Sequence, residues 1–115
     1  MRHAHTRLVT GEEMARIDQR AIESGIPGAV LMETAGRGVA CILKELLGGF
    51  QDRKITLLCG KGNNGGDGFV VARLASLDGA QVRTFLFASA DDVKGDARLN
   101  LDRARECGLH IEEIR

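Results

Sequence analysis

The sequence is poor in aromatic residues, carries no net charge and has no long apolar run. Its 115 residues include four Phe but neither Trp nor Tyr, and 16 basic residues balance 16 acidic ones. A neutral chain has no field that attracts nucleic-acid phosphates or an anionic membrane, and four Phe are too few for a base-stacking platform. No apolar stretch approaches the about 20 residues that span a bilayer. The composition therefore argues against nucleic-acid and membrane partners and fits one small globular domain.

The cysteines offer neither a disulfide framework nor a metal site. Cys41, Cys59 and Cys107 are far apart, and each lies in an apolar pattern without a Cys-x-x-Cys pair. Reduced thiols in the core of a cytoplasmic protein fit this distribution. The first 13 residues contain no apolar segment of the kind that marks a signal peptide. We therefore expect a cytoplasmic protein with buried, reduced thiols.

Apolar periodicity and turn residues predict an order of elements typical of an α/β protein. Strands that alternate with helices of this length imply crossover connections and a parallel sheet. Three strands make a small sheet, so we expect the front half of a larger doubly wound domain. The predicted elements are helices at 10–24, after a capping box at 10–13, and at 29–47, a strand at 54–59, a helix at 68–77, a strand at 80–88, a helix at 96–107 and a strand at 109–115.

Two packing details follow from the same patterns. The unbroken apolar core of the first strand, ITLLC, predicts burial on both faces. Small residues inside the helix at 29–47, Gly36 and Gly38 among them, indicate close packing against another backbone. The apolar stripe that we expect to face the core in this helix consists of Leu31, Ala35, Val39, Ile42 and Leu46.

The turn after the first strand is the most unusual stretch of the sequence. Residues 60–66 hold four glycines and two asparagines. Ligands of parallel α/β sheets bind outside the carboxyl ends of the strands, and glycines there allow positive φ angles and close approach to the backbone. A helix that begins near Asp67 would point its free N–H groups and positive dipole end at the same place. The turn therefore predicts a phosphate-binding site.

Other interpretations of the turn stay open. Residues 60–65 fit G-x-G-x-x-G, but Asp91 and Asp92 lie slightly beyond the position of a ribose-binding acid. No Gly-Lys-Ser/Thr closes the turn, which excludes a P-loop. The amide and carboxylate oxygens of residues 63–67 are hard ligands that suit a cation. In a turn without function, Asp67 would act only as a helix N-cap.

Three landmarks, in order, resemble the YjeF N-terminal family, the NAD(P)H-hydrate epimerases. They are TGEEMARIDQRAIESGI at 10–26, LMETAG at 31–36 and GKGNNGGDGFVVAR at 60–73. The resemblance implies a three-layer α/β/α sandwich with a Rossmann-like parallel sheet, of which residues 1–115 form the N-terminal portion without an internal boundary. It also implies interconversion of the R and S forms of hydrated NADH and NADPH, which repairs damaged nicotinamide cofactors together with a separate or fused dehydratase.

The resemblance also implies site residues and partners. It places the hydrated dinucleotide against Asn63, Asn64, Gly65, Gly66 and Asp67, and a potassium ion against Asn64. The family's catalytic aspartate, its second glycine-rich loop and its other potassium ligands match nothing within residues 1–115, so no catalytic residue is predicted. A homodimer is expected from the family. Two alternatives remain: a non-catalytic binding or scaffold module of the same fold, and a conventional NAD-binding Rossmann domain.

Two charged residues near these motifs are assigned to the surface. Glu33 interrupts the apolar pattern of its helix, and the sequence favours a helix-surface carboxylate over a residue that approaches the site. Lys61 lies inside the glycine turn, where a solvated loop lysine is favoured over a phosphate ligand.

Overall fold

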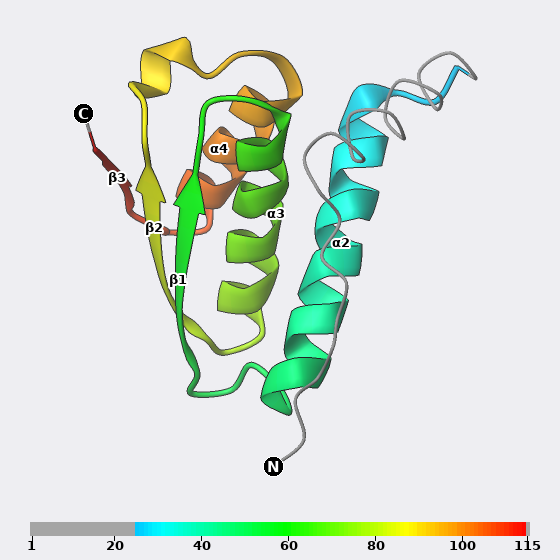
Figure 1. The fold of residues 1–115 in the computed structure, drawn as a ribbon, viewed down its shortest axis with the longest axis vertical. Helices are drawn as coiled ribbons and strands as arrows, with labels where there is room; N and C mark the ends of the chain where they lie inside the picture. Colours follow the sequence, from blue (N-terminus) through cyan, green and yellow to red (C-terminus); the bar gives the residue numbers. More distant parts are fainter. Residues whose placement is uncertain (1–24, 115) are drawn as a thin grey trace.

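In the computed structural model, which describes residues 25–114, three helices pack against a three-stranded parallel sheet. The strands pair in the order β1-β2-β3, all parallel (Figure 1). The predicted α/β order is confirmed over this part of the chain, whereas the helix expected at 10–24 lies outside the described residues. The elements are α2 (Gly28–Leu47), β1 (Lys54–Cys59), α3 (Asn63–Leu77), β2 (Gln81–Leu86), the 3₁₀ turn η1 (Ala90–Asp92), α4 (Gly95–Glu106) and β3 (Ile111–Glu113).

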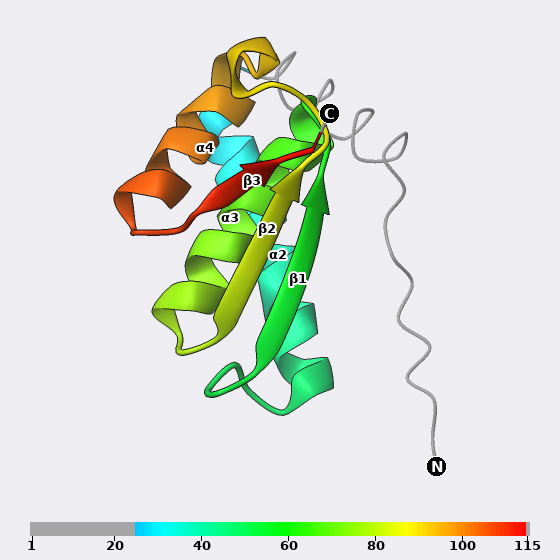
Figure 2. The same cartoon turned by 90° about the vertical axis from the view of Figure 1, so that its left-hand side faces the viewer.

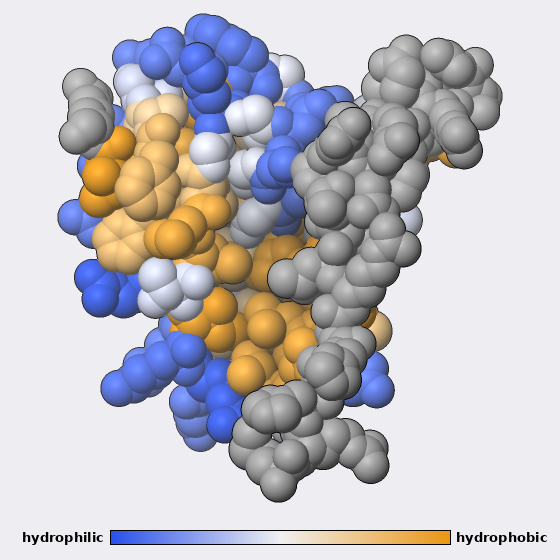
Figure 3. Space-filling view, in the orientation of Figure 1, coloured by the Kyte–Doolittle hydropathy of each residue, from blue (hydrophilic) through white to orange (hydrophobic). Residues whose placement is uncertain are grey.

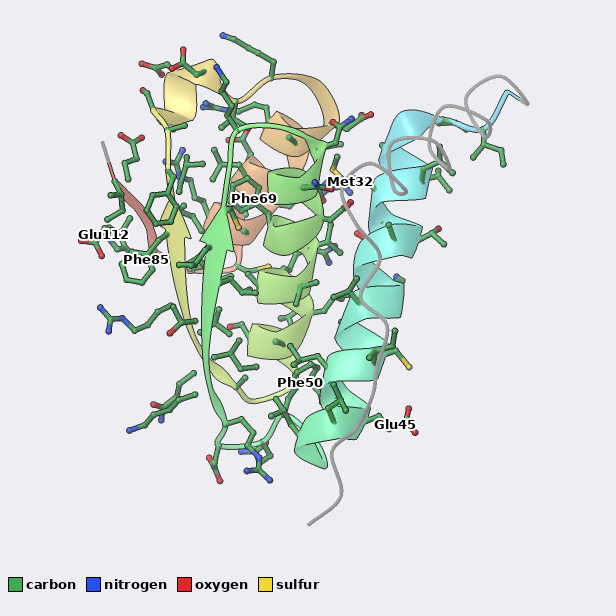
Figure 4. All side chains as sticks on the ribbon, in the orientation of Figure 1. Met32, Glu45, Phe50, Phe69, Phe85 and Glu112 are labelled. Carbon is green, nitrogen blue, oxygen red and sulfur yellow. The ribbon has the colours of Figure 1, made fainter. Side chains whose placement is uncertain are left out.

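All three helices lie on one face of the sheet, behind the strands in Figure 2. On the other face Leu58 is 68% exposed. It is in register with Phe85 of β2, which is in register with Glu112 of β3, and both project away from the helices in Figure 4. The Arg83 guanidinium lies over the Phe85 ring, 5.2 Å from its centroid. Apolar residues gather over the strands in Figure 3.

The prediction that β1 is buried on both faces is therefore wrong for the part of the fold that the structure describes. Burial alternates along β1, with Ile55 and Cys59 buried and Leu58 exposed. An unbroken apolar run indicates only that both faces of the strand tolerate burial, and covering the second face requires a second layer. Residues 25–114 supply one helical layer of the predicted three-layer sandwich.

The core lies between the sheet and the helices, in two adjoining clusters. The larger one centres on Phe69 of α3, Leu86 of β2 and Leu101 of α4, each 0% exposed. The smaller one contains Phe50 and Val71 and lies between α2, α3 and β1. Because α3 contributes to both clusters, it is the central helix of the layer. None of the helices within residues 25–114 is long and apolar enough to cross a membrane.

α2 turns Gly36 and Ala40 toward the core, whereas Gly38, also expected in close packing, is exposed. The predicted stripe does not face the core as a whole, since Leu31 and Ala35 are only half-buried. Met32, Gly36 and Ala40 are buried, whereas the predicted Val39, Ile42 and Leu46 are 42%, 40% and 48% exposed. Both stripes are apolar, so periodicity did not distinguish them. The close approach of α3 decides the orientation, because a Cβ on Gly36 would lie 2.3 Å from Cγ1 of Val70 and 3.3 Å from the backbone oxygen of Asp67.

Two glycines on the same helix give a matched test of this packing. Gly36→Ala forces Val70 or the α3 backbone to move and should lower the free energy of unfolding by about 1–3 kcal/mol. No atom of the described residues lies within 4 Å of the ideal Cβ position of Gly38, so Gly38→Ala should raise the free energy of unfolding by about 0.8–1 kcal/mol through helix propensity alone. Urea denaturation of both variants checks the sign of each change, and equal stabilisation by both would contradict the described α2–α3 contact.

Candidate functional site

The glycine turn joins the carboxyl end of β1 to α3, at the end of the molecule where α2, α3 and α4 all begin (Figure 1). Gly62 is the N-cap of α3 and has extended backbone angles, φ −88° and ψ −167°. The first helical hydrogen bond runs from the Gly66 N–H to the Gly62 carbonyl, 3.1 Å away. The helix thus begins at Asn63, earlier than the predicted start at 67–68, and Asp67 is not its N-cap.

Two of the turn's glycines are required by the protein's own packing. A Cβ on Gly65 would lie 1.8 Å from the Gly60 carbonyl oxygen, and one on Gly66 would lie 2.5 Å from the Met32 Sδ. The same Cβ would also lie 2.9 Å from the Cα of Ala97 in α4. This packing explains why residues with poor helix propensity form the first turn of α3. The expected positive φ angles are wrong, since Gly60, Gly62, Gly65 and Gly66 all lie outside that region.

The other two glycines leave the outer side of the turn open. Among residues 25–114, no atom lies within 4 Å of the ideal Cβ positions of Gly60 and Gly62, and residues 60–64 are exposed. A ligand can therefore approach the backbone from this side without meeting a side chain at these two positions.

The electrostatics of the turn favour an anion. Within the described part of the chain no side chain caps the N-terminus of α3, and the first turn of this helix contains no acidic residue. The first N–H groups of a helix have no intrahelical partner and carry the positive end of the dipole. Lys61 adds a positive charge next to them in the sequence. Phosphate is the group that such an N-terminus typically binds.

The five residues predicted to bind ligand differ in their access to it. Asn63 and Asn64 are exposed in the first turn of α3, where their amide groups can reach a ligand. Gly65 and Gly66 are buried and serve the packing described above. Asp67 is 8% exposed in the second turn, with its backbone carbonyl close to Gly36 of α2.

The donor chemistry at Asn64 suits the predicted potassium ion, whereas the local charge does not. An amide oxygen is a hard ligand of the kind that potassium accepts. Within residues 25–114, however, no three His, Cys, Asp or Glu side chains gather as a metal-binding group. The positive end of α3 disfavours a cation, so an ion at Asn64 requires negative ligands in addition to this side chain.

Other charged residues near these elements stabilise the fold. Glu33 is half-buried and accepts from Arg73 of α3, while its second oxygen lies 2.9 Å from the Arg37 Nε. The sequence assigned Glu33 to the helix surface, whereas the structure places it in the α2–α3 contact. Asp91 and Asp92 are exposed in η1 and do not lie at the end of β2, as a ribose-binding acid would.

Sequence reasoning missed a buried polar contact next to the turn. Asn100 of α4 is 1% exposed, and its Nδ2 donates to the Met32 Sδ at 3.1 Å and to the Asp96 carbonyl at 3.0 Å. Figure 4 shows Met32 beside the first turns of α3. The available signal was a lone Asn on the otherwise apolar face of the helix at 96–107.

Comparison with known proteins assigns the chain to a family. The family model described as YjeF-related protein N-terminus matches residues 28–115. The chain belongs to this family. The resemblance noted in the sequence is thereby confirmed. A bifunctional NAD(P)H-hydrate repair enzyme Nnr from Moorella thermoacetica is 48% identical over 103 residues, which make up 88% of this chain and 19% of that protein.

Two relatives that are shorter than the Moorella protein are named NAD(P)H-hydrate epimerase. The one from Rhodobacter capsulatus is 41% identical over 90% of this chain, and the one from Rhodopirellula baltica is 38% identical over 92%. The chain spans 51% and 43% of their lengths, respectively. A crystal structure of the yeast protein ynu0 shares the fold, with a TM-score of 0.73 at 23% identity over 94% of this chain and 47% of the yeast chain.

The two kinds of glycine in the turn predict opposite outcomes. Gly65→Ala places a methyl group against the Gly60 carbonyl, and because backbone on both sides must shift we expect a loss of about 3 kcal/mol or more in unfolding free energy. Gly62→Ala should cost only about 0.5–1 kcal/mol, because alanine is a poorer N-cap than glycine, while placing a methyl group on the open side. Urea denaturation and titration with inorganic pyrophosphate separate the two effects. Equal stability of both variants would contradict the described geometry.

Cys59, at the end of β1, gives the fold a defined alkaline sensitivity. All three cysteines are free, but only Cys59 is buried, so the expectation of three core thiols is wrong for Cys41 and Cys107. Burial raises the pKa of the Cys59 thiol to about 11. An unfolded thiol loses its proton near pH 8.5, so the stabilisation is complete below that pH and is lost as the pH rises toward 11.

Urea denaturation between pH 8 and pH 11 tests this effect against Cys59→Ala. The wild-type chain should lose up to about 1.4 kcal/mol per pH unit more than the variant. The difference between the two proteins reports the Cys59 thiol alone, because the lysines that titrate in the same pH range are present in both. Parallel stability curves would contradict a buried, protonated thiol.

Proposed function

We propose that this chain is the N-terminal portion of an NAD(P)H-hydrate epimerase domain, which interconverts the R and S forms of hydrated NADH and NADPH. The observation that carries the proposal is the N-terminus of α3, without a side-chain cap among the described residues, behind an exposed turn whose outer side is open at Gly60 and Gly62. The relatives named NAD(P)H-hydrate epimerase support the substrate class. The site receives the pyrophosphate of the dinucleotide at the first turn of α3.

The residues of the turn have distinct roles in this proposal. The free N–H groups of the first turn donate to the pyrophosphate oxygens, and the helix dipole stabilises their charge. Asn63 and Asn64 are exposed, and in this proposal their side-chain amides donate to the ligand. Asn64 would offer its side-chain amide oxygen to a potassium ion, and the pyrophosphate would supply part of the negative charge that this position otherwise lacks. Potassium would contribute by neutralising ligand charge.

The proposal assigns no catalytic acid or base to these residues. Asp67 is 8% exposed and holds a position inside the α2–α3 contact, which does not suit proton transfer to a ligand on the open side. Because the chain spans about half of each epimerase, the reacting groups are expected in the portion of the domain that this sequence does not cover. A homodimer and a cooperating dehydratase, fused in the bifunctional relatives, are part of the same proposal.

An assay with purified epimers of hydrated NADH tests the function in the full-length polypeptide that carries this chain. Asn64→Ala should slow interconversion by about tenfold or more, because a hydrogen bond to a charged group is worth about 1.5–3 kcal/mol. The matched control is Gln81→Ala, an exposed amide at the start of β2, at the opposite end of the sheet. It should leave the rate within about twofold.

Two outcomes would contradict the proposal. Absence of interconversion by the wild-type protein, with potassium present, would exclude an epimerase. An active wild type whose rate is insensitive to Asn64→Ala would remove the turn from the site. Retained binding of the hydrated dinucleotide without interconversion would favour the scaffold module over the enzyme.

A further inference from the structure

Asn100 is the polar side chain of α4 at the junction of three helices. It is 1% exposed, and its neighbours on the same face of α4, Ala97 and Leu101, are both 0% exposed and apolar. Its Nδ2 makes two contacts, one with the Asp96 carbonyl in its own helix and one with the Met32 Sδ in α2. The second contact joins α4 to α2.

Met32 in turn lies against the first turn of α3. Its Sδ and Cε occupy the space in which a Cβ of Gly66 would stand, at 2.5 Å and 2.7 Å from that position. The Cα of Ala97 in α4 lies 2.9 Å from the same point, so Met32 and Ala97 both border the Cβ side of Gly66. The first turn of α3 is therefore held between α2 and α4, and the Met32 side chain sets how closely it approaches α2.

A methionine side chain sets such a distance poorly unless another group holds it in one conformation. Its three rotatable bonds and soft thioether let it fill gaps in several conformations. The Asn100 amide donates to the sulfur and so selects the conformation in which Sδ faces α4. An apolar residue at 100 would fill the same space without making this selection.

Asn100 also lowers the stability of the fold in a way that an apolar residue at this position would not. Its Oδ1 is buried and finds no hydrogen-bond partner among the described residues. A buried acceptor without a partner destabilises a fold, and an apolar side chain of similar shape does not have this effect. Residues that break a packing rule in this way commonly serve a function.

The geometry points to Asn100 as a positioning residue that acts through Met32 on the first turn of α3. By fixing the Met32 sulfur, it holds Gly66 and the turn's free N–H groups in one place. The consequence for ligand binding rests on the function proposed above. The consequence for the turn itself does not, because the Gly66 N–H forms its hydrogen bond within α3, to the Gly62 carbonyl.

The test compares Asn100→Leu with Thr84→Val. Thr84 is 2% exposed on β2, and its Oγ1 is likewise buried without a partner in the described part of the chain, so it matches Asn100 in kind but belongs to the sheet. Both variants should unfold at the same urea concentration as the wild type or a higher one, since each removes an orphaned acceptor. Only Asn100→Leu should speed hydrogen exchange of the Gly66 amide, by about tenfold.

A second pair of variants shows whether the effect passes through Met32. Met32→Leu keeps the volume and removes the sulfur acceptor, so it should speed Gly66 exchange to a similar extent. The double variant Met32→Leu/Asn100→Leu should then exchange no faster than either single variant, since coupled residues are not additive. Additive effects, unchanged exchange in Asn100→Leu, or a fall in its urea midpoint that matches the exchange change would each overturn the positioning role.

Titration with inorganic pyrophosphate separates this inference from the proposed function. If the turn binds phosphate, Asn100→Leu should weaken binding by about tenfold, while Thr84→Val leaves it unchanged. If the wild-type chain does not bind pyrophosphate, the proposed function fails at this site, and the exchange results still decide the role of Asn100. Equal weakening by both variants would overturn the positioning role even with a functional turn.

Discussion

The structure depends on how closely the start of α3 approaches its neighbours. Gly65 touches the backbone of Gly60, Gly66 touches Met32 and Ala97, and Gly36 of α2 admits Val70. A single Cβ at any of these glycines would stand within 3 Å of another atom. Because interiors are close-packed, such contacts leave no room for a small outward shift. The first turn of α3 therefore has one position relative to α2, α4 and the end of β1.

This constraint connects the core to the candidate site. The inner side of the turn is closed by packing, and the outer side, at Gly60 and Gly62, is open. A helix N-terminus binds an anion well only when its N–H groups are held in place and no carboxylate already occupies them. Packing provides the first condition, and the absence of an acid in the first turn of α3 provides the second. The glycines thus serve the fold and the site at the same time.

The uncovered face of the sheet gives the domain its other notable property. Leu58 and Phe87 are 68% and 54% exposed, and Figure 3 shows apolar surface over the strands. Parallel sheets are almost always covered on both faces. The epimerases that resemble this chain are about twice its length. A domain of the full length would have the residues needed to form a second layer, which agrees with the three-layer fold that the resemblance implied.

The sequence by itself determined the class of the fold, the strand β1 with its bounds, the position of the glycine turn and the family. These features follow from local patterns: apolar runs, turn residues and an ordered motif. It did not determine which apolar stripe of α2 faces the core, where α3 begins, or which face of β1 is covered. Both stripes of α2 are apolar, and Asn-Asn-Gly-Gly has low helix propensity. Only the tertiary structure decided these points, because contacts with other elements, at Gly36, Gly65 and Gly66, outweigh local preference.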